Sequence, residues 1–107
     1  IACQWAKALG ATVIGTASTE AKAELARAHG ADHVILYGRE EVAARVRALT
    51  GGEGVAVVYD GVGKDTFEAS LDSLRTRGTM VSFGNASGPL PPIDPLQLTQ
   101  KGSLFFT

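Results

Sequence analysis

The sequence predicts an α/β fold built as a doubly wound parallel sheet, with helices over both of its faces. Helical patterns and short apolar runs alternate four times along the 107 residues. The apolar runs are continuously hydrophobic, whereas strands with one solvated face alternate between apolar and polar residues. Each helical segment is roughly ten residues long, which suits a crossover between parallel strands. Residues 1–107 are expected to form one domain.

The first half of the chain has clearly marked element boundaries. Apolar residues recur at helical spacing from the N-terminus, and Gly10 ends that helix. Thr19 has the side chain of a helix N-cap, and Gly30 marks the end of the helix that it starts. The expected elements are a helix over residues 1–9, a strand over 12–16, a helix over 20–29 and a strand over 33–37.

Two further helix–strand pairs follow before the chain changes character. Glu41 and Arg45 lie four residues apart, a spacing that supports a helix. All four prolines fall after Ser87, so we expect a loop with one short helical turn there. The other expected elements are a helix over residues 39–50, a strand over 55–60, a helix from about Asp65 to Leu74, a strand over 79–84 and an edge strand over 103–107.

Composition and charge exclude several classes of function. Apolar residues make up 45% of the chain and charged residues 20%, as in an ordinary globular protein. A net charge of −1 gives no field that would attract nucleic acid or an anionic membrane, and no apolar stretch is long enough to span a bilayer. Cys3 is the only cysteine, which excludes an internal disulfide and a cysteine-rich zinc site and indicates a cytoplasmic protein.

The N-terminus indicates a longer parent protein. The chain opens inside a helical pattern, without an initiator Met, a signal peptide or a helix cap. We therefore expect a truncated domain that lacks its first strand. In a dinucleotide-binding domain, that strand leads into the Gly-rich loop that holds the pyrophosphate, so this loop would be missing as well.

The junction between the first strand and the second helix carries the first candidate site. With Thr19 as the N-cap, Lys22 takes the third helical position, where a capping box prefers Glu and the helix dipole disfavours a cation by about 0.3–1 kcal/mol. A phosphate bound by Lys22, the Ser18 hydroxyl and the free amides of the helix start would offset this cost.

An acid is missing at the same junction. In many dinucleotide folds an acid at this strand end binds the ribose hydroxyls of NAD, so its absence beside a cation suits the 2′-phosphate of NADP. A solvated Lys22 offset by Glu20 and Glu24 accounts for the same residues. The local sequence leaves both interpretations open.

A second candidate segment, residues 58–65, passes from a strand through Gly61 and Gly63 into a helix. It lacks the third glycine of a dinucleotide fingerprint and the spacing of a P-loop. Locally it favours a tight strand-to-helix turn. Ligands of parallel sheets bind beyond the carboxyl ends of the strands, however, and this turn lies there.

Two weaker candidates lie at other strand ends. Gly84 would let the backbone approach a ligand closely, and Asn85 offers both a donor and an acceptor. Tyr37 could stack on a nucleotide or hydrogen-bond to it, although a surface tyrosine at a strand end is the commoner case.

The remaining notable side chains are assigned no chemistry. His29 and His33 have no carboxylate or cysteine at ligand spacing, so neither a metal site nor a catalytic role is expected. Trp5 and the pair Phe105–Phe106 are expected in the core or in an interface.

Six motifs occur in an order and spacing that are more specific than any one of them: IACQWAKALGA, VIGTAST with AK at 21–22, GAD.VI.Y, VVYDGVG, MVSFGNASG and QKGSLF. Together they resemble the nucleotide-binding domain of NADPH-dependent quinone oxidoreductases, the zeta-crystallin-like branch of the medium-chain dehydrogenase/reductase superfamily. The resemblance covers essentially the whole chain. It implies a Rossmann-type NAD(P)-binding domain in which hydride passes directly from NADPH to a quinone, without zinc and without a catalytic residue in this part of the protein.

The resemblance also implies roles for individual residues. Lys22 and Ser18 would hold the 2′-phosphate with Tyr37 nearby, Gly61 and Val62 would line the adenine–ribose side, and Phe83, Gly84, Asn85 and Ala86 would flank the nicotinamide half. Many members of the branch carry Ser or Cys in place of Gly61, so no side-chain role is carried over to that position.

The branch forms dimers through the strand that corresponds to Ser103–Thr107, and a homodimer is expected here. Two other functions stay open from the sequence. The parent could be another medium-chain reductase, such as an enoyl reductase. It could also be a non-catalytic module that senses NADP or serves a structural purpose.

Overall fold

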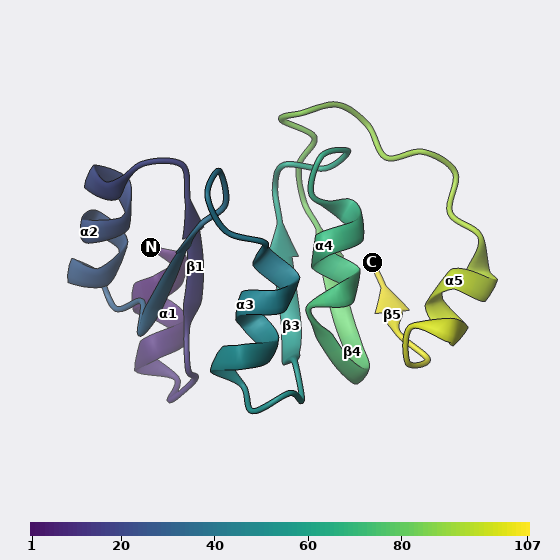
Figure 1. The fold of residues 1–107 in the computed structure, drawn as a ribbon, viewed down its shortest axis with the longest axis horizontal. Coiled ribbons are helices and arrows are strands. Elements are labelled where there is room, and N and C mark those ends of the chain that lie inside the picture. Colours follow the sequence, from purple (N-terminus) through teal and green to yellow (C-terminus); the bar gives the residue numbers. More distant parts are fainter. The chain divides into compact units, whose positions relative to one another are not determined.

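The computed structural model describes all 107 residues, and helices alternate with strands along the whole chain (Figure 1). The chain forms two compact units, Ile1–Arg45 and Val46–Thr107. The elements are α1 (Ala2–Ala8), β1 (Ile14–Ala17), α2 (Glu20–Ala28), β2 (His33–Leu36), α3 (Val42–Leu49), β3 (Val55–Asp60), α4 (Phe67–Asp72), β4 (Leu74–Ser82), α5 (Pro95–Gln100) and β5 (Phe105–Phe106).

The first unit contains a parallel pair of strands with α2 packed on it. β1 and β2 run in register from Ile14 opposite His33 to Ala17 opposite Leu36. Ala23 of α2 and Ile35 of β2 are fully buried. The expected cap at Thr19 is confirmed, because its side chain accepts a hydrogen bond from the main-chain N–H of Lys22. The helix therefore starts where the sequence predicts it.

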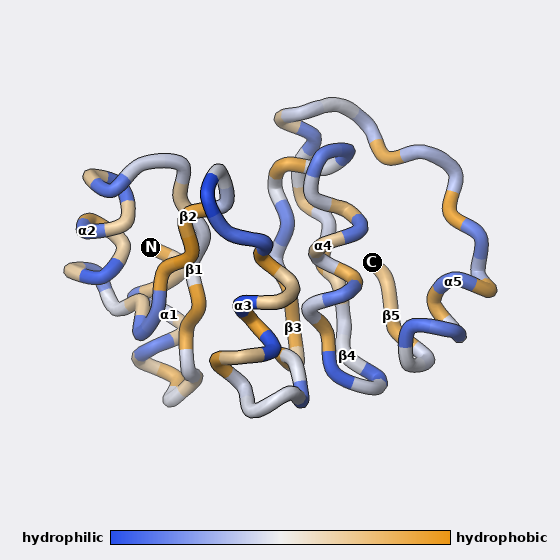
Figure 2. Tube along the Cα trace, in the orientation of Figure 1, coloured by the Kyte–Doolittle hydropathy of each residue, from blue (hydrophilic) through white to orange (hydrophobic).

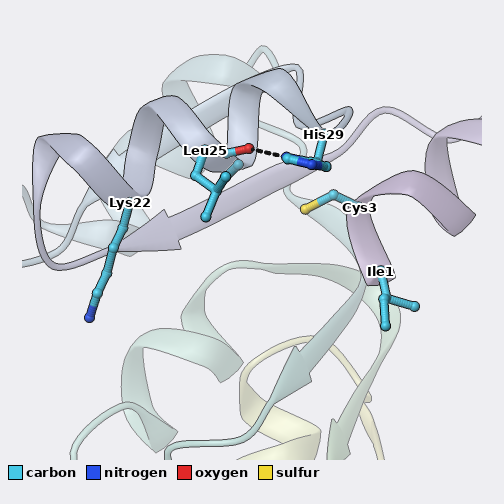
Figure 3. Close-up of a pocket in the computed structure, with 6 residues that line it drawn as sticks. Ile1, Cys3, Lys22, Leu25 and His29 are labelled. Carbon is cyan, nitrogen blue, oxygen red and sulfur yellow. Dashed lines mark hydrogen bonds between the residues drawn. The ribbon is translucent and has the colours of Figure 1, made fainter.

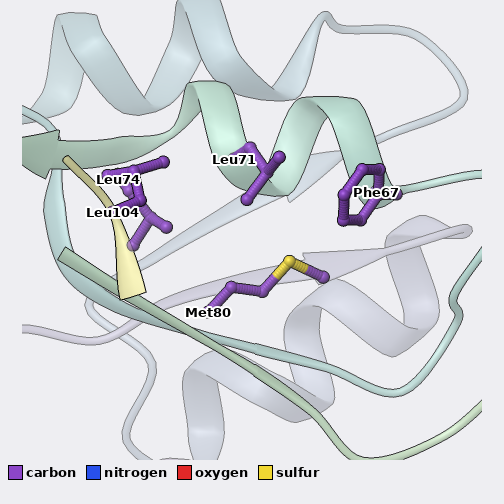
Figure 4. Close-up of a cluster of buried hydrophobic side chains, with 5 residues drawn as sticks. All are labelled: Phe67, Leu71, Leu74, Met80 and Leu104. Atoms are coloured by element: carbon purple, nitrogen blue, oxygen red, sulfur yellow. The ribbon is translucent and has the colours of Figure 1, made fainter. Parts of the chain in front are cut away.

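The second unit is a three-stranded parallel sheet in the order β3-β4-β5. Figure 4 shows Phe67 and Leu71 reaching from α4 toward Met80 of β4. The ring of Phe67 also meets that of Phe106 edge-on, with 6.3 Å between the centroids. Burial of these apolar side chains supplies the main stabilisation of this unit. The buried cluster comprises Phe67, Leu71, Leu74, Met80 and Leu104.

Arg47 ties the end of α3 to two other segments of the second unit. Its guanidinium donates hydrogen bonds only to main-chain carbonyls, an arrangement that uses the planar fork of arginine fully. Arg47 thereby links the loop before β3 to the junction between α4 and β4. The acceptors are the carbonyl oxygens of Gly52 (3.0 Å), Glu53 (2.8 Å), Asp72 (3.1 Å) and Leu74 (2.8 Å).

The parallel α/β architecture confirms the predicted fold class, and the strands hydrogen-bond within two sheets, β1-β2 in the first unit and β3-β4-β5 in the second. The proline-rich segment contains a helix, α5, of six residues, which is longer than the single turn expected. Arg45 forms an ion pair with Glu40 (3.2 Å) instead of Glu41.

The boundary between α4 and β4 differs from the prediction. The helix ends at Asp72, and β4 begins at Leu74, five positions before the expected strand. Leu74 is fully buried and pairs with Val55, so tertiary packing draws it out of the helix. The next pair is Val57 with Thr79, so residues 75–78 of β4 form an irregularity and have no partner in β3.

Hydropathy follows the elements only in part. Figure 2 shows β2 as hydrophobic and the segment after it as hydrophilic. In β3, Val57 and Tyr59 are exposed although their strand is continuously apolar. Trp5 and Phe105 are also exposed (69% and 59%), so neither is a core residue of this chain. None of the helices combines the length and hydropathy needed to cross a membrane.

Candidate functional site

The start of α2 places a cation at the end of β1. Lys22 occupies the third position of the helix that Thr19 caps. Its ammonium lies 3.5 Å from the hydroxyl of Ser18, the residue that follows β1. The Lys22 side chain therefore lies at the carboxyl end of the strand, together with the helix amides.

The two acids nearest to Lys22 in the sequence have another partner. The guanidinium of Arg27 pairs with Glu20 at 3.1 Å and with Glu24 at 2.5 Å. These pairs raise the pKa of Arg27, and the hydrogen bond that Arg27 donates to Glu20 is the first cause. No carboxylate pairs with Lys22, so the interpretation in which Glu20 and Glu24 offset its charge has no support in the structure.

Tyr37 leaves the sheet beside Ser18. Its main-chain N–H donates to the carbonyl of Ala17 (3.2 Å), the last residue of β1, and its side chain is half exposed. The structure thus brings Ser18, Lys22 and Tyr37 to the carboxyl ends of two neighbouring strands.

A buried carboxylate organises the turn after β3. One oxygen of Asp60 accepts hydrogen bonds from the main-chain N–H groups of Val62 (2.9 Å) and Gly63 (3.0 Å). The other accepts from the hydroxyls of Thr66 (2.7 Å) and Ser70 (2.6 Å). Asp60 is only 5% exposed. The carboxylate therefore fixes both the turn and its junction with α4.

The same contacts set the acidity of Asp60. Burial by itself raises the pKa of this carboxyl. Hydrogen bonds from Ser70, Gly63, Thr66 and Val62 outweigh burial, so the pKa of Asp60 lies below its ordinary value. Asp60 was missed as a site residue, although an acid at a strand end followed by Thr66 and Ser70, four apart on the next helix, is a readable signal.

The loop after β4 is hydrogen-bonded along its length to the turn after β3. Four main-chain bonds resemble a short strand ladder that continues beyond the sheet. The hydroxyl of Ser87 adds two more, donating to the carbonyl of Val62 (2.8 Å) and accepting from the main-chain N–H of Asp65 (3.0 Å). The structure therefore brings the second set of predicted residues, Gly61, Val62 and 83–86, together. The main-chain bonds run from Phe83 N to Asp60 O (3.0 Å), Ala86 N to Gly61 O (3.3 Å), Ser87 N to Val62 O (2.8 Å) and Lys64 N to Gly88 O (3.2 Å).

Two glycines allow the loops to approach so closely. A Cβ on Gly63, which has φ +94°, would lie 2.6 Å from the carbonyl oxygen of Gly88. A Cβ on Gly84 would lie 2.7 Å from the carbonyl oxygen of Gly61. The close approach expected at Gly84 is thus made to the neighbouring loop of the protein itself.

The side chains on the outside of these loops face solvent. Phe83 is 69% exposed and Val62 37%, and Asn85 and Ala86 are exposed as well. The tight turn that the local sequence favours at Gly61–Gly63 is present, and it presents apolar and amide groups at the carboxyl end of β3 and β4.

A pocket in the first unit shares only Lys22 with the candidate residues. Figure 3 shows Lys22 at one side of this pocket, pointing away from Cys3 and His29. The ring of His29 hydrogen-bonds to the carbonyl of Leu25 (2.8 Å). No three His, Cys, Asp or Glu side chains gather as a metal site would require. The lining residues are Ile1, Cys3, Lys22, Leu25, Ala26 and His29.

The chain is similar to one protein family and to several known proteins. Residues 1–106 match the family model described as zinc-binding dehydrogenase. The chain is 59% identical to a quinone oxidoreductase of Salmonella typhimurium, covering 100% of this chain and 33% of that protein. It is 55% identical to a 2-haloacrylate reductase of a Burkholderia species, covering 96% of this chain and 31% of that protein.

Solved structures agree with these relatives. A crystal structure of an Escherichia coli quinone oxidoreductase complexed with NADPH superposes with a TM-score of 0.95 at 55% identity. The match covers 100% of this chain and 33% of that one. The chain thus spans about a third of the length of the relatives that it matches.

Proposed function

The chain belongs to the zinc-binding dehydrogenase family, and we propose that it is the cofactor-binding part of an oxidoreductase that transfers hydride from NADPH to a quinone. The observation that carries the cofactor choice is the Lys22 ammonium, which lies beside Ser18 at a strand end without any carboxylate partner. The relatives named quinone oxidoreductases support the activity.

The family description implies zinc, but these residues do not fit a zinc site. Zinc is bound by groups of Cys, His, Asp or Glu side chains. Cys3 is the only cysteine, and no group of three potential ligands is present. These residues therefore supply no zinc site, and no step is assigned to a metal. We propose a zinc-independent reaction on the resemblance to the quinone oxidoreductase branch.

The 2′-phosphate of NADPH suits the start of α2. The helix dipole makes a lone cation at this position unfavourable by about 0.3–1 kcal/mol, and a bound phosphate removes that penalty. Lys22 supplies a charge, Ser18 a hydroxyl, and the helix its free amides. We propose that Tyr37, at the neighbouring strand end, contacts the same part of the nucleotide.

The loops of the second unit offer a different surface. Gly61 and Val62 would contact the adenine–ribose side, and Phe83, Gly84, Asn85 and Ala86 the nicotinamide side. When bound, NADPH supplies the hydride. The residues of this chain bind and orient the cofactor, and none of them acts as an acid or a base.

A second candidate function is reduction of an activated carbon–carbon double bond, as in an enoyl reductase. The relative named 2-haloacrylate reductase is as similar to this chain (55%) as the Escherichia coli quinone oxidoreductase (55%). A module that senses NADP or serves a structural purpose is a third possibility, with binding but no turnover.

We also propose a homodimer of the full-length protein through the segment Ser103–Thr107, of which the structure forms a strand only over Phe105–Phe106. β5 is the edge strand of its sheet, and Phe105 is 59% exposed on it. Pairing with a second copy would cover this edge. With a single cysteine, the protein suits the reducing conditions of the cytoplasm.

The cofactor assignment is tested with Lys22→Ala in the full-length protein. We expect the Kd for NADPH to rise about tenfold to a hundredfold, because a charge-assisted hydrogen bond contributes about 1.5–3 kcal/mol. The Kd for NADH should change by less than about twofold. Lys7→Ala removes an equal charge from the same unit and serves as the control. Equal weakening of NADPH and NADH by Lys22→Ala would contradict the assignment.

The activity is tested by NADPH oxidation with a series of quinones and with 2-haloacrylate. Turnover with quinones but not with the acrylate supports the first proposal, and the reverse supports the second. NADPH binding without oxidation by any acceptor would identify a sensor or structural module.

A further inference from the structure

We propose that Gly61 controls the position of the Phe83 ring and, through it, the affinity of the protein for its nicotinamide cofactor. This inference rests on the proposed function, in which Phe83 contacts the cofactor. The ring lies directly against the bare Cα of Gly61. A Cβ built at Gly61 would stand 2.9 Å from Cζ of Phe83 and 3.0 Å from Cε2.

Those distances leave no room for a side chain at position 61 while the ring stays where it is. Non-bonded carbons settle at about 3.5–4.0 Å, so even the methyl group of alanine would displace the ring. The ring of Phe83 therefore occupies the space that a side chain of residue 61 would fill. Glycine at position 61 is what permits this placement.

The displacement would be confined to the ring. Phe83 is anchored by its main chain, whose N–H donates to the carbonyl of Asp60 at 3.0 Å. Its side chain is 69% exposed and is free to rotate into solvent. A side chain at position 61 should thus move the aromatic ring without moving the loop that carries it.

The neighbouring glycines behave differently. At Gly63 and Gly84, an added Cβ would meet main-chain oxygens at 2.6 and 2.7 Å, and Gly63 also has φ +94°. Substitution there strains the backbone. Gly61 is not among the glycines with positive φ, so alanine can adopt its conformation. Position 61 is therefore the one of the three at which a change acts mainly on an aromatic side chain.

An exposed ring that rests on the backbone offers a flat apolar face at a strand end. Aromatic rings bind planar groups in stacked or edge-on arrangements, and both depend on the position and tilt of the ring. The planar group in question is the ring at the nicotinamide end of the cofactor. In this protein, where the ring of Phe83 occupies the space of a residue-61 side chain, a substitution at Gly61 should lower the affinity by displacing the ring.

A double-mutant cycle in the full-length protein tests the inference, with the Kd for NADPH measured by fluorescence titration. We expect Gly61→Ala to raise the Kd about threefold to tenfold, with an unchanged thermal midpoint. In the Phe83→Ala background, the same substitution should have a much smaller effect, because no ring remains to be displaced and only direct contact of position 61 with the cofactor is left. Gly84→Ala, which meets the main chain, is the comparison and should lower the thermal midpoint.

The outcomes separate this inference from the proposed function. If Phe83→Ala alone leaves the Kd unchanged, Phe83 does not contact the cofactor, and its placement in the site is wrong. If Phe83→Ala weakens binding but Gly61→Ala does not, or if Gly61→Ala acts equally in both backgrounds, control of the ring by Gly61 is overturned. A Gly61→Ala variant that fails to fold also overturns it, since only the ring should move.

Discussion

Replacing Asp60 with alanine removes one buried carboxylate and leaves four hydrogen-bond donors without their acceptor. Two of these donors are the main-chain N–H groups of Val62 and Gly63. The other two are the hydroxyls of Thr66, the N-cap of α4, and of Ser70 within α4, and both can rotate toward other acceptors. A carbonyl of Gly63 already lies 3.3 Å from the hydroxyl of Thr66. The cost of Asp60→Ala therefore comes chiefly from the main chain.

The expected loss of stability follows from these donors. A buried donor left unpaired costs about 1–3 kcal/mol, so the two N–H groups give at most about 2 to 6 kcal/mol, and about 2 to 4 kcal/mol once access of water to the exposed Val62 is allowed for. Asp60→Asn keeps an oxygen for the two N–H groups, and its amide can donate to the hydroxyls. We expect the asparagine variant to lose only about 1 to 2 kcal/mol.

The assay is urea denaturation followed by circular dichroism at several pH values. Because the folded pKa of Asp60 is lowered, its charge stabilises the protein fully above the unfolded pKa, about 3.9, and this contribution is lost as the pH falls toward the folded pKa. The stability difference between wild type and Asp60→Asn should thus be constant near neutral pH and shrink below pH about 4.

The control for Asp60 is Asp65→Asn, an exposed acid in the same turn, which should change stability by less than about 0.5 kcal/mol. A difference between wild type and Asp60→Asn that stayed constant down to pH about 2 would refute the reasoning about charge. An Asp60→Ala variant as stable as wild type would refute the reasoning about the donors.

Three further substitutions test other parts of the fold by the same denaturation assay. Arg47→Lys loses most of the bonds to main-chain carbonyls and should cost about 2 to 3 kcal/mol; an unchanged midpoint would mean that a simple charge suffices. Gly63→Ala forces a methyl group toward the carbonyl of Gly88 and should cost about 2 to 4 kcal/mol, whereas a neutral effect would show that the loops can separate freely. Leu71→Ala empties a fully buried position and should cost about 2 to 5 kcal/mol, against less than about 1 kcal/mol for the exposed Leu96→Ala.

The features that the sequence predicted well depend on neighbouring residues. Thr19 caps α2 and Gly30 ends it because both effects are local. The strand Val55–Asp60 was also predicted with its observed bounds. The resemblance to quinone oxidoreductases is confirmed, since the chain is 55–59% identical to proteins of that name.

The features that were missed depend on residues distant in the sequence. Leu74 looked helical because its place in the core opposite Val55 is invisible in a local pattern. Asp94 and Pro95 form a good helix start, yet the density of prolines around them favoured a loop. The network of Asp60 is assembled only when α4 folds back on β3.

The same limit applies to the candidate site. The sequence alone allowed two interpretations of the Lys22 charge: it binds a phosphate, or it is offset by Glu20 and Glu24. Both stayed open because either acid lies close enough on the helix to approach Lys22. In the structure, both acids form ion pairs with Arg27. At Gly84, the sequence indicated that another group approaches the backbone closely, but it did not identify that group. In the structure it is the backbone of Gly61.

The ladder between the turn after β3 and the loop after β4 has a consequence for how this protein can change. The four main-chain bonds of the ladder do not depend on which side chains the loops carry, whereas two further bonds between the loops require the hydroxyl of Ser87. Val62, Asn85 and Ala86 point outward from it and are exposed. These three positions can be varied, in evolution or in a library, to adjust ligand preference while the framework beneath them stays intact.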